Sequence, residues 1–145
     1  MPTSSRLALA VHTLATLALH KGEPVRSEVI AKSASTNPAV IRRLLSMLNA
    51  AGLSQSQLGQ GGGSLLAQPP EAISLLDVYK AVENEQLFAL HRTEPSDACT
   101  VGKHIQHVLQ GPFTRAGEAM EGELANVSIA DIVRDIQKLA KRKTA

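Results

Sequence analysis

Two adjacent arginines, Arg42 and Arg43, are the residues whose type and placement best suit a chemical role. They fall on one face of a helix predicted over 37–51, together with Ala39 and Ser46, and this helix face has no acidic residue. Arginine can donate two hydrogen bonds to O6 and N7 of guanine in the major groove. The pair therefore indicates a surface that reads duplex DNA, although taken alone it would also fit an ordinary solvated helix face.

The single cysteine, Cys99, limits redox and metal chemistry. One thiol permits no intrachain disulfide and cannot supply the thiolates of a zinc or iron–sulfur site. Cys99 is a candidate redox sensor because it precedes a predicted helix, whose N-terminus favours the thiolate; a structural thiol is the alternative. His104 and His107 would join Cys99 at a metal only if that helix bent at its start. We therefore predict no metal site and no cofactor.

The sequence also argues against catalysis. The glycine-rich run over 59–63 lacks the Gly-Lys-Ser/Thr ending of a phosphate-binding loop, and no predicted helix begins directly after it. The carboxylates of Glu118, Glu121 and Glu123 lie on a predicted helix without a nucleophile or base at catalytic spacing. Aromatic residues make up 2% of the chain, which argues against stacking on single-stranded bases. We therefore predict a binding protein rather than an enzyme.

Charge is distributed unevenly along the 145 residues. Residues 1–68 have six basic and two acidic side chains, residues 69–137 have five basic and eleven acidic ones, and the last eight residues add four basic ones. A basic N-terminal half on a chain of net charge +2 suggests an anionic partner for that half. The longest apolar stretch, 7–19, is too short to span a membrane. With one cysteine, these features predict a cytoplasmic protein without a membrane partner.

Helical patterns organise the first 53 residues. Apolar residues recur at helical spacing over 5–20. A short helix is predicted from Ser27 as its N-cap, with Val29 and Ile30 buried. Asn37-Pro38 is the strongest helix-start signal, and that helix ends at Gly52, where Leu53 can close on its last turn in a Schellman motif. Its predicted inward residues are Ile41, Leu44, Leu45 and Leu48.

A β-hairpin is predicted next, with strands over 53–58 and 64–67 joined by the glycines of 59–63. Three helices followed by a hairpin is the order of a winged helix-turn-helix, in which the third helix enters the major groove. Double-stranded DNA is therefore the predicted partner. A winged helix that acts as a protein-binding adaptor is the alternative. After the hairpin, a capping box from Ser74 to Asp77 begins a further helix.

The fold class predicted for the whole chain is mostly α with a small β-hairpin. A winged helix-turn-helix domain spans 1–83, and 84–145 contain a loop over 84–99, a long helix over 101–125 with a kink or break at Gly111-Pro112, and a last helix capped by Ser128. The apolar stripe of the long helix exceeds what a domain of this size needs for its core, which predicts a two-fold dimer. The predicted dimer contacts are Ile105, Leu109, Phe113, Met120 and Leu124.

The run Ser27–Leu66, together with Ile73–Val78 and Asn126–Asp131, resembles the Rrf2 family of bacterial winged-helix regulators, the IscR, NsrR and CymR type. The stretches 37–43, 85–91 and 99–103 are most similar to its YwnA-like branch. The resemblance implies a homodimeric transcriptional regulator, a repressor in our prediction, that binds a pseudo-palindromic operator. By position it implies that Arg6 contacts a phosphate, that Thr36, Asn37, Ala39, Val40, Arg42 and Arg43 face the groove, and that Gln57, Gln60, Gly61 and Gly62 form the wing.

Two departures from the family pattern concern the wing and the sensor. Leu58 stands where many members place an arginine in the wing. Cluster-binding members have three cysteines in the loop before the long helix, whereas this chain has only Cys99, so we predict no iron–sulfur cluster. An unknown effector would then act on the Cys99 thiol, or bind as a small molecule in the aliphatic space between the winged domain and the long helix.

Overall fold

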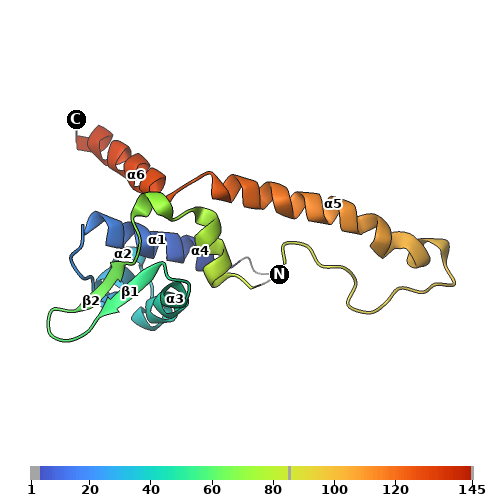
Figure 1. Ribbon diagram of the computed structural model, residues 1–145, viewed down its shortest axis with the longest axis horizontal. Helices are drawn as coiled ribbons and strands as arrows, with labels where there is room; N and C mark the ends of the chain where they lie inside the picture. Colours follow the sequence, from blue (N-terminus) through green and yellow to red (C-terminus); the bar gives the residue numbers. More distant parts are fainter. Residues whose placement is uncertain (1–3, 85, 145) are drawn as a thin grey trace.

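The computed structural model, which describes residues 4–84 and 86–144, has a winged part and a helical arm that projects from it (Figure 1). The mostly helical fold with one small hairpin confirms the predicted fold class. The helices are α1 (Arg6–Leu19), α2 (Ser27–Ala34), α3 (Pro38–Ala50), α4 (Leu75–Val82), α5 (Thr100–Ala125) and α6 (Ile129–Thr144), with a short 3-10 helix η1 (Pro70–Ala72) and strands β1 (Ser54–Gln57) and β2 (Gly63–Leu66).

One aliphatic core holds the winged part together. It lies between α1, α2, α3, the hairpin, α4 and the start of α6. The inward residues predicted for α3 are all buried there, in one cluster with Leu14 of α1 and Val78 of α4. Thr13 is the polar residue buried most deeply among those described, and its hydroxyl donates to the carbonyl of Leu9 at 2.8 Å. Burial of this apolar surface is what stabilises the part that positions α3.

Both ends of α3 form as the sequence predicts. The Asn37 side-chain oxygen accepts from the backbone N–H of Ala39 at 2.8 Å, so Asn37 is the N-cap. At the other end the N–H of Leu53 donates to the carbonyl of Leu48 at 3.0 Å, and the N–H of Gly52 donates to that of Asn49. This pair of bonds is the Schellman motif, and it fixes where the chain leaves α3 for the hairpin.

The prediction for α2 was wrong in two details. Ser27 is the first helical residue rather than the N-cap, which is Arg26 in an extended conformation without a capping side chain. Val29 is 49% exposed, and the buried residues of α2 are Ile30 and Ala31. The eight-residue helix packs on α1 and α3 through this inward face. Val29, one position along the helix, is rotated out of that contact, since neighbouring residues are about 100° apart.

The hairpin pairs β1 and β2 in antiparallel register, with Gln57 opposite Gly63. Gly61 has a φ of +77°, a conformation that residues with a Cβ rarely adopt. A Cβ at Gly63 would lie 2.6 Å from the carbonyl oxygen of Val25, which pairs with Ser64 in an isolated bridge. The close backbone approach allowed by this glycine is therefore to the chain's own backbone, next to the turn of the hairpin.

Two capping boxes lie side by side where α4 and α6 begin. The side chain of Ser74 pairs with the backbone of Asp77, and that of Ser128 pairs with the backbone of Asp131, each with its reciprocal bond. Ser74 and Ser128 also form an antiparallel bridge, and the N–H of Ile129 donates to the carbonyl of Ile73 at 2.8 Å. We call this joint the staple.

The staple places α6 with the winged part, although the predicted division of the chain grouped it with 84–145. Ile129 is fully buried in the core, and α6 packs on α1 and η1. Among the described residues, only those between α4 and the staple leave the winged part and return to it (Figure 1).

The arm consists of α5 and the loop that leads to its far end (Figure 1). Of the kink or break expected at Gly111-Pro112, the break is absent, since α5 is one continuous helix of 26 residues. Pro112 is exposed, so the carbonyl of Val108, which its ring leaves without a donor, is open to water. No residue of α5 is buried.

Candidate nucleic-acid interface

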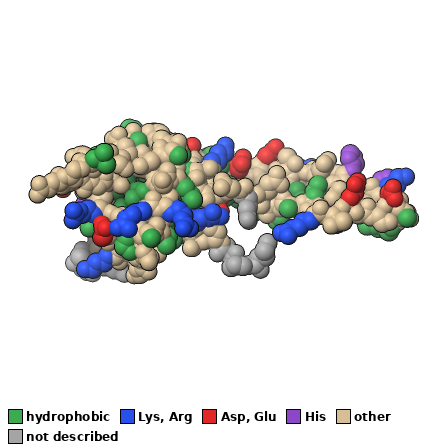
Figure 2. Space-filling view, turned by 90° about the horizontal axis from the view of Figure 1, so that it is seen from below, with side chains coloured by type: hydrophobic (Ala, Val, Ile, Leu, Met, Phe, Trp, Pro, Cys, Tyr) green, Lys and Arg blue, Asp and Glu red, His purple; other side chains and the backbone are tan. Residues whose placement is uncertain are grey.

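The outer face of α3 presents the residues predicted to meet DNA. Ala39, Val40, Arg42, Arg43 and Ser46 are all exposed on this helix. Figure 2 views the molecule from the side on which α3 lies in Figure 1 and shows Lys and Arg side chains in a row across the winged part. Exposed basic residues of α2, of its N-cap and of α3 are Arg26, Lys32, Arg42 and Arg43.

An acidic residue from another helix reaches this surface. Glu28 lies in the first turn of α2, and its Oε1 accepts from Nη2 of Arg42 at 2.7 Å. Its own backbone amide, followed by the guanidinium of Arg42, holds the pKa of the Glu28 carboxyl below its ordinary value, so it is ionised at neutral pH. The face of α3 is acid-free along its own sequence, but the assembled surface is not. Glu28 is 14 residues away, so no periodicity within α3 could have revealed it.

Arg43 differs from its neighbour. Within the described part of the chain, no acceptor binds its guanidinium, whereas Arg42 is paired. Asn37 is exposed, but its side-chain oxygen already caps α3, so its amide nitrogen is left for a further contact. Thr36 is half-buried in the turn before α3. Of the six residues predicted to face the groove, Arg43 is the one whose charged donors are most available.

The wing is attached to α3 by a contact that the sequence analysis missed. The side-chain amide of Asn49 bridges the hydroxyls of Ser54 and Ser56 on β1. A polar residue on α3 facing a serine-rich strand is a signal that could have indicated it. The bridge sets the hairpin against the same helix that carries the arginines.

The predicted wing residues lie at the turn end of the hairpin. Gln57, Gln60 and Gly61 are exposed, and Gly62 is half-buried. A Cβ at Gly62 would lie 2.1 Å from the carbonyl of Gln57, so this glycine tightens the turn. Leu58, which stands in place of the family's arginine, is 91% exposed at this end.

Arg6, predicted to contact a phosphate, is part of an internal network. Its Nη2 lies 3.1 Å from Oε2 of Glu83, and its Nε donates to the hydroxyl of Ser4 at 3.2 Å. The Ser4 hydroxyl in turn donates to the same carboxylate at 2.8 Å. The guanidinium thus ties the start of α1 to the end of α4.

The predicted dimer contacts on α5 fall into two groups. Phe113 and Met120 line a cavity beside α4, and Phe113 packs on Phe88 of the loop that leads to α5, with ring centroids 5.2 Å apart. Ile105, Leu109 and Leu124 are half-buried along the helix. The most exposed apolar side chains of α5 are Val101 at 65% and Val108 at 62%, and neither was among the predicted contacts.

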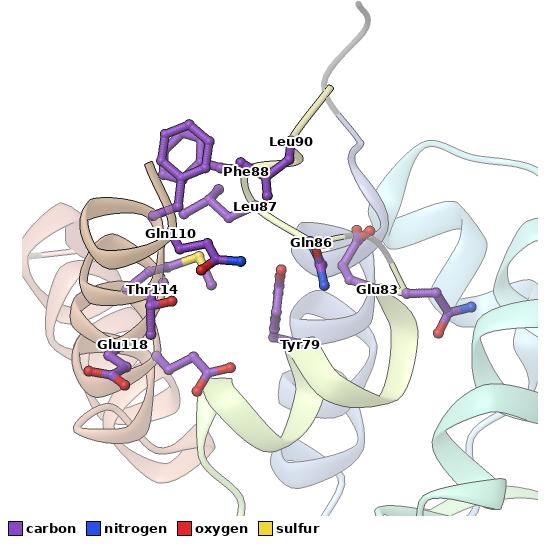
Figure 3. Close-up of a pocket in the computed structure, with 14 residues that line it drawn as sticks. Tyr79, Glu83, Gln86, Leu87, Phe88, Leu90, Gln110, Thr114 and Glu118 are labelled. Atoms are coloured by element: carbon purple, nitrogen blue, oxygen red, sulfur yellow. The ribbon is translucent and has the colours of Figure 1, made fainter. Parts of the chain in front are cut away.

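A cavity of about 500 Å³ lies between α4, α5 and the segment that follows α4 (Figure 3). It occupies the space in which we expected an effector, but its lining is not purely aliphatic. Tyr79 of α4, two phenylalanines and the carboxylates of Glu118 and Glu121 line it, together with glutamines. The carboxylates and glutamines make this lining more polar than the sequence suggested.

Cys99 is exposed at the N-cap of α5, at the far end of the arm. Hydrogen bonding from the backbone N–H groups of Gly102 and Val101 lowers the pKa of the thiol. This is the local environment that makes a cysteine reactive. Within residues 4–84 and 86–144 the structure brings together no group of three His, Cys, Asp or Glu side chains suited to a metal ion.

Comparison with known proteins matches residues 3–135 to the Rrf2 family, described as an iron-dependent transcriptional regulator. YwnA of Bacillus subtilis strain 168, named as an HTH-type transcriptional regulator, is 43% identical over 92% of this chain and 98% of its own. A crystal structure described as that of a DNA-binding protein is 40% identical, with a TM-score of 0.71, over 88% of this chain and 98% of its own. CymR, the global cysteine regulator of B. subtilis, shares the fold at 21% identity with a TM-score of 0.68, over 92% and 97%.

The family description raises the question of an iron cofactor, and the donors of this chain do not fit one of the iron–sulfur type. Such clusters are held chiefly by cysteine thiolates, and the sequence has one cysteine. Two chains together would supply two thiols.

The family match and the relatives also settle the class of the protein. They are transcriptional regulators, which agrees with the prediction that the chain is not an enzyme and favours DNA over a protein partner for the winged part. No helix in the described part of the chain is long and apolar enough to cross a membrane. The chain belongs to the Rrf2 family, and it is a DNA-binding transcriptional regulator.

Proposed function

We propose that the protein acts in the cytoplasm as a homodimer that binds a pseudo-palindromic operator and represses transcription there. The observation that carries this proposal is the arm. A helix of 26 residues without one buried residue leaves its apolar stripe half-covered, and Val101 and Val108 are open to solvent. A second copy of the same helix is the simplest partner that would cover this stripe, because a two-fold interface uses the same surface on both chains.

A two-fold dimer would turn one recognition surface into two. Helix-turn-helix dimers bind half-sites about 34–36 Å apart, one turn of the double helix. Each winged part would place its α3 in a major groove, with Arg43 free to read a base and the hairpin beside it. The operator should then be an inverted repeat with the strongest base preferences one turn apart.

Repression would follow when the dimer occupies a promoter. The described parts of the chain are a DNA-binding unit and an arm, so a dimer that covers a promoter would block polymerase without any further contact. An effector that altered the arm would change the spacing of the two recognition helices and hence operator affinity. Cys99 and the cavity beside α4 are the two places on the arm where a redox or small-molecule effector would act.

The test combines operator selection with assembly measurements. Purified protein would select duplexes from a random library, and the recovered sequences should contain an inverted repeat. Light scattering at micromolar concentration should give the mass of two chains, and in vitro transcription from a promoter that overlaps the repeat should fall as protein is added. A monomeric mass, or recovered duplexes without symmetry, would contradict the homodimer, and increased transcription would contradict repression.

DNA binding itself has a separate signature. Affinity for duplex should fall steeply with salt, because each neutralised phosphate releases counterions with a log–log slope of about −0.9. A winged helix that served as a protein adaptor would show no such dependence and no preference among duplexes.

A further inference from the structure

The ion pair between Glu28 and Arg42 lies in a cleft of about 370 Å³ between α2, α3 and the hairpin. Polar residues surround it, including Ser46 and Asn49 of α3 and Ser56 of β1. The two charged side chains are 59% and 58% exposed, so the pair stands at the surface and is not sealed in the core. A ligand that approaches α3 therefore meets both charges at once.

An acidic side chain at this place should lower the affinity of the protein for a polyanionic partner such as DNA. Each phosphate that approaches Arg42 also approaches the carboxylate that neutralises it, and the pair brings no net charge to the backbone. A guanine edge is different, because O6 and N7 are neutral acceptors that a guanidinium can bind as a pair of bonds. Glu28 therefore weakens a phosphate contact by Arg42 more than a base contact.

We propose that Glu28 is a specificity-determining residue, which keeps Arg42 from binding phosphates indiscriminately and leaves it available to an acceptor pair on a base. Discrimination of this kind needs a repulsive element as well as an attractive one. The inference rests on the proposed placement of α3 in the major groove. It goes further in giving two neighbouring arginines different roles: Arg43 has no acidic partner among the described residues, whereas Arg42 is held by one.

Glu28→Gln tests the proposal. The variant keeps the shape of the side chain and a hydrogen-bond acceptor but removes the charge. Its affinity for random duplex should rise, on the order of tenfold per protomer at about 0.1 M salt, because Arg42 then binds a phosphate of its own. The salt slope on random duplex should steepen by about 0.9 per protomer. Affinity for the selected operator should change less, so the ratio of operator to random affinity falls.

Two controls separate this effect from a change in overall charge or folding. Glu23→Gln makes the same charge change at an exposed residue after α1 whose carboxylate forms no hydrogen bond or ion pair among the described residues. It should leave the operator-to-random ratio as in the wild type. In an Arg42→Ala background, Glu28→Gln should lose its effect, because the carboxylate acts through that guanidinium. Thermal unfolding of each variant would show that it remains folded.

The outcomes distinguish this inference from the proposed function. If the wild type prefers its selected operator but Glu28→Gln leaves both the ratio and the salt slope unchanged, the role of Glu28 is wrong and DNA binding stands. An equal rise in random-duplex affinity with Glu23→Gln would also overturn it. So would an undiminished effect of Glu28→Gln on that affinity in the Arg42→Ala background. If the wild type shows neither operator preference nor salt dependence, the DNA-binding function itself fails.

Discussion

The winged part and the arm are built from the same kind of sequence pattern but have opposite surroundings. In α3, apolar residues at helical spacing are all buried, and Ile41 and Leu48 have no exposed surface. In α5, residues with similar spacing are at best half-buried, and Val101 and Val108 face solvent. An apolar stripe shows that a helix face needs a partner. Whether that partner is in the same chain depends on the connections at the two ends of the helix.

The connections explain the difference between these regions. Short turns join α1, α2 and α3 and bring their stripes together, and the Schellman motif then directs the chain into the hairpin. The long segment between α4 and α5 instead carries the chain to the far end of the arm, so α5 returns to the winged part only at its C-terminus (Figure 1). The winged part buries its apolar stripes within one chain, whereas the stripe of the arm would be covered by a second chain.

The largest expected effect is on stability, and it should separate the two regions. Leu48→Ala removes a fully buried side chain from the winged core and should lower the free energy of unfolding by about 2–5 kcal/mol. Val108→Ala, at an exposed position of the arm, is the matched control and should change it by less than about 0.5 kcal/mol. Urea denaturation of a sample diluted below the dimer dissociation constant measures both. Equal losses would mean that the arm is as well packed as the core.

Dimer formation, unlike stability, should depend on the arm more than on the winged core. Ile105→Glu places a charge on the half-buried stripe of α5 and should raise the dimer dissociation constant by about tenfold to a hundredfold, the range of an interface hot spot. Analytical ultracentrifugation would measure this. Met120→Glu sharpens the comparison, because Met120 also lines the cavity beside α4. An effect of Ile105→Glu without one of Met120→Glu would assign Met120 to packing within the chain, and an unchanged dimer in both would contradict pairing through α5.

Within the winged part, Arg43→Ala should cost about 1–3 kcal/mol in operator binding and relax the base preference at one position per half-site. The reason is that its guanidinium is exposed and free of partners among the described residues. Arg42→Ala should also relax one position, but with a smaller change in random-duplex affinity, because Glu28 already neutralises it. Selection of duplexes by each variant provides the measurement. Equal losses on operator and random duplex would instead assign that arginine to a phosphate.

The smallest expected effect is chemical and concerns the far end of the arm. Backbone N–H groups lower the pKa of the Cys99 thiol in the folded protein, so its thiolate should form at lower pH than in the unfolded chain. The rate of alkylation by iodoacetamide should therefore reach its half-maximum at lower pH in buffer than in urea, with the same thiol serving as its own control. Coincident pH profiles would show that the start of α5 does not influence the thiol.

A reactive Cys99 acts as a sensor only if its oxidation changes the affinity of the protein for DNA. Mild oxidant should lower the operator affinity of the wild type and leave Cys99→Ser unaffected, through sulfenic acid, a mixed disulfide or a bridge between two chains. A bridge requires Cα atoms within about 7 Å of each other. If oxidant changes neither protein, or both alike, the thiol is structural and an effector must act at the cavity beside α4.

Local signals in the sequence predicted most of the elements. The N-cap at Asn37, the end of α3 at Gly52 and the capping boxes at Ser74 and Ser128 depend on residues within a few positions of one another, and the structure confirms each. The predictions that were wrong concern residues whose placement depends on how the helices pack and on their exposure to water. Val29 is turned out by the packing of α2, and Pro112 causes no break in α5, where its surroundings are open to water.

The candidate site was predicted in its residue types but not in its pairings. The exposed arginines of α3 follow from its helical period, whereas the Glu28 carboxylate reaches Arg42 from another helix, and Glu83 reaches Arg6 across the winged part. Such contacts depend on how helices pack, which one sequence does not specify through spacing. The same limit applies to α6, whose pattern resembles that of the arm but whose first residue is buried in the core.

A small rotation at the staple of Ser74 and Ser128 would become a large displacement at the far end of the arm. The staple fixes the C-terminal end of α5 to the winged part, while the start of α5 lies at the far end. A helix of 26 residues is about 39 Å long at 1.5 Å per residue. A rotation of about 5° at this fulcrum therefore moves the far end by about 3.4 Å, the rise of one base pair along a strand of DNA. Small angular changes at the joint are thus matched in scale to the step between adjacent base pairs.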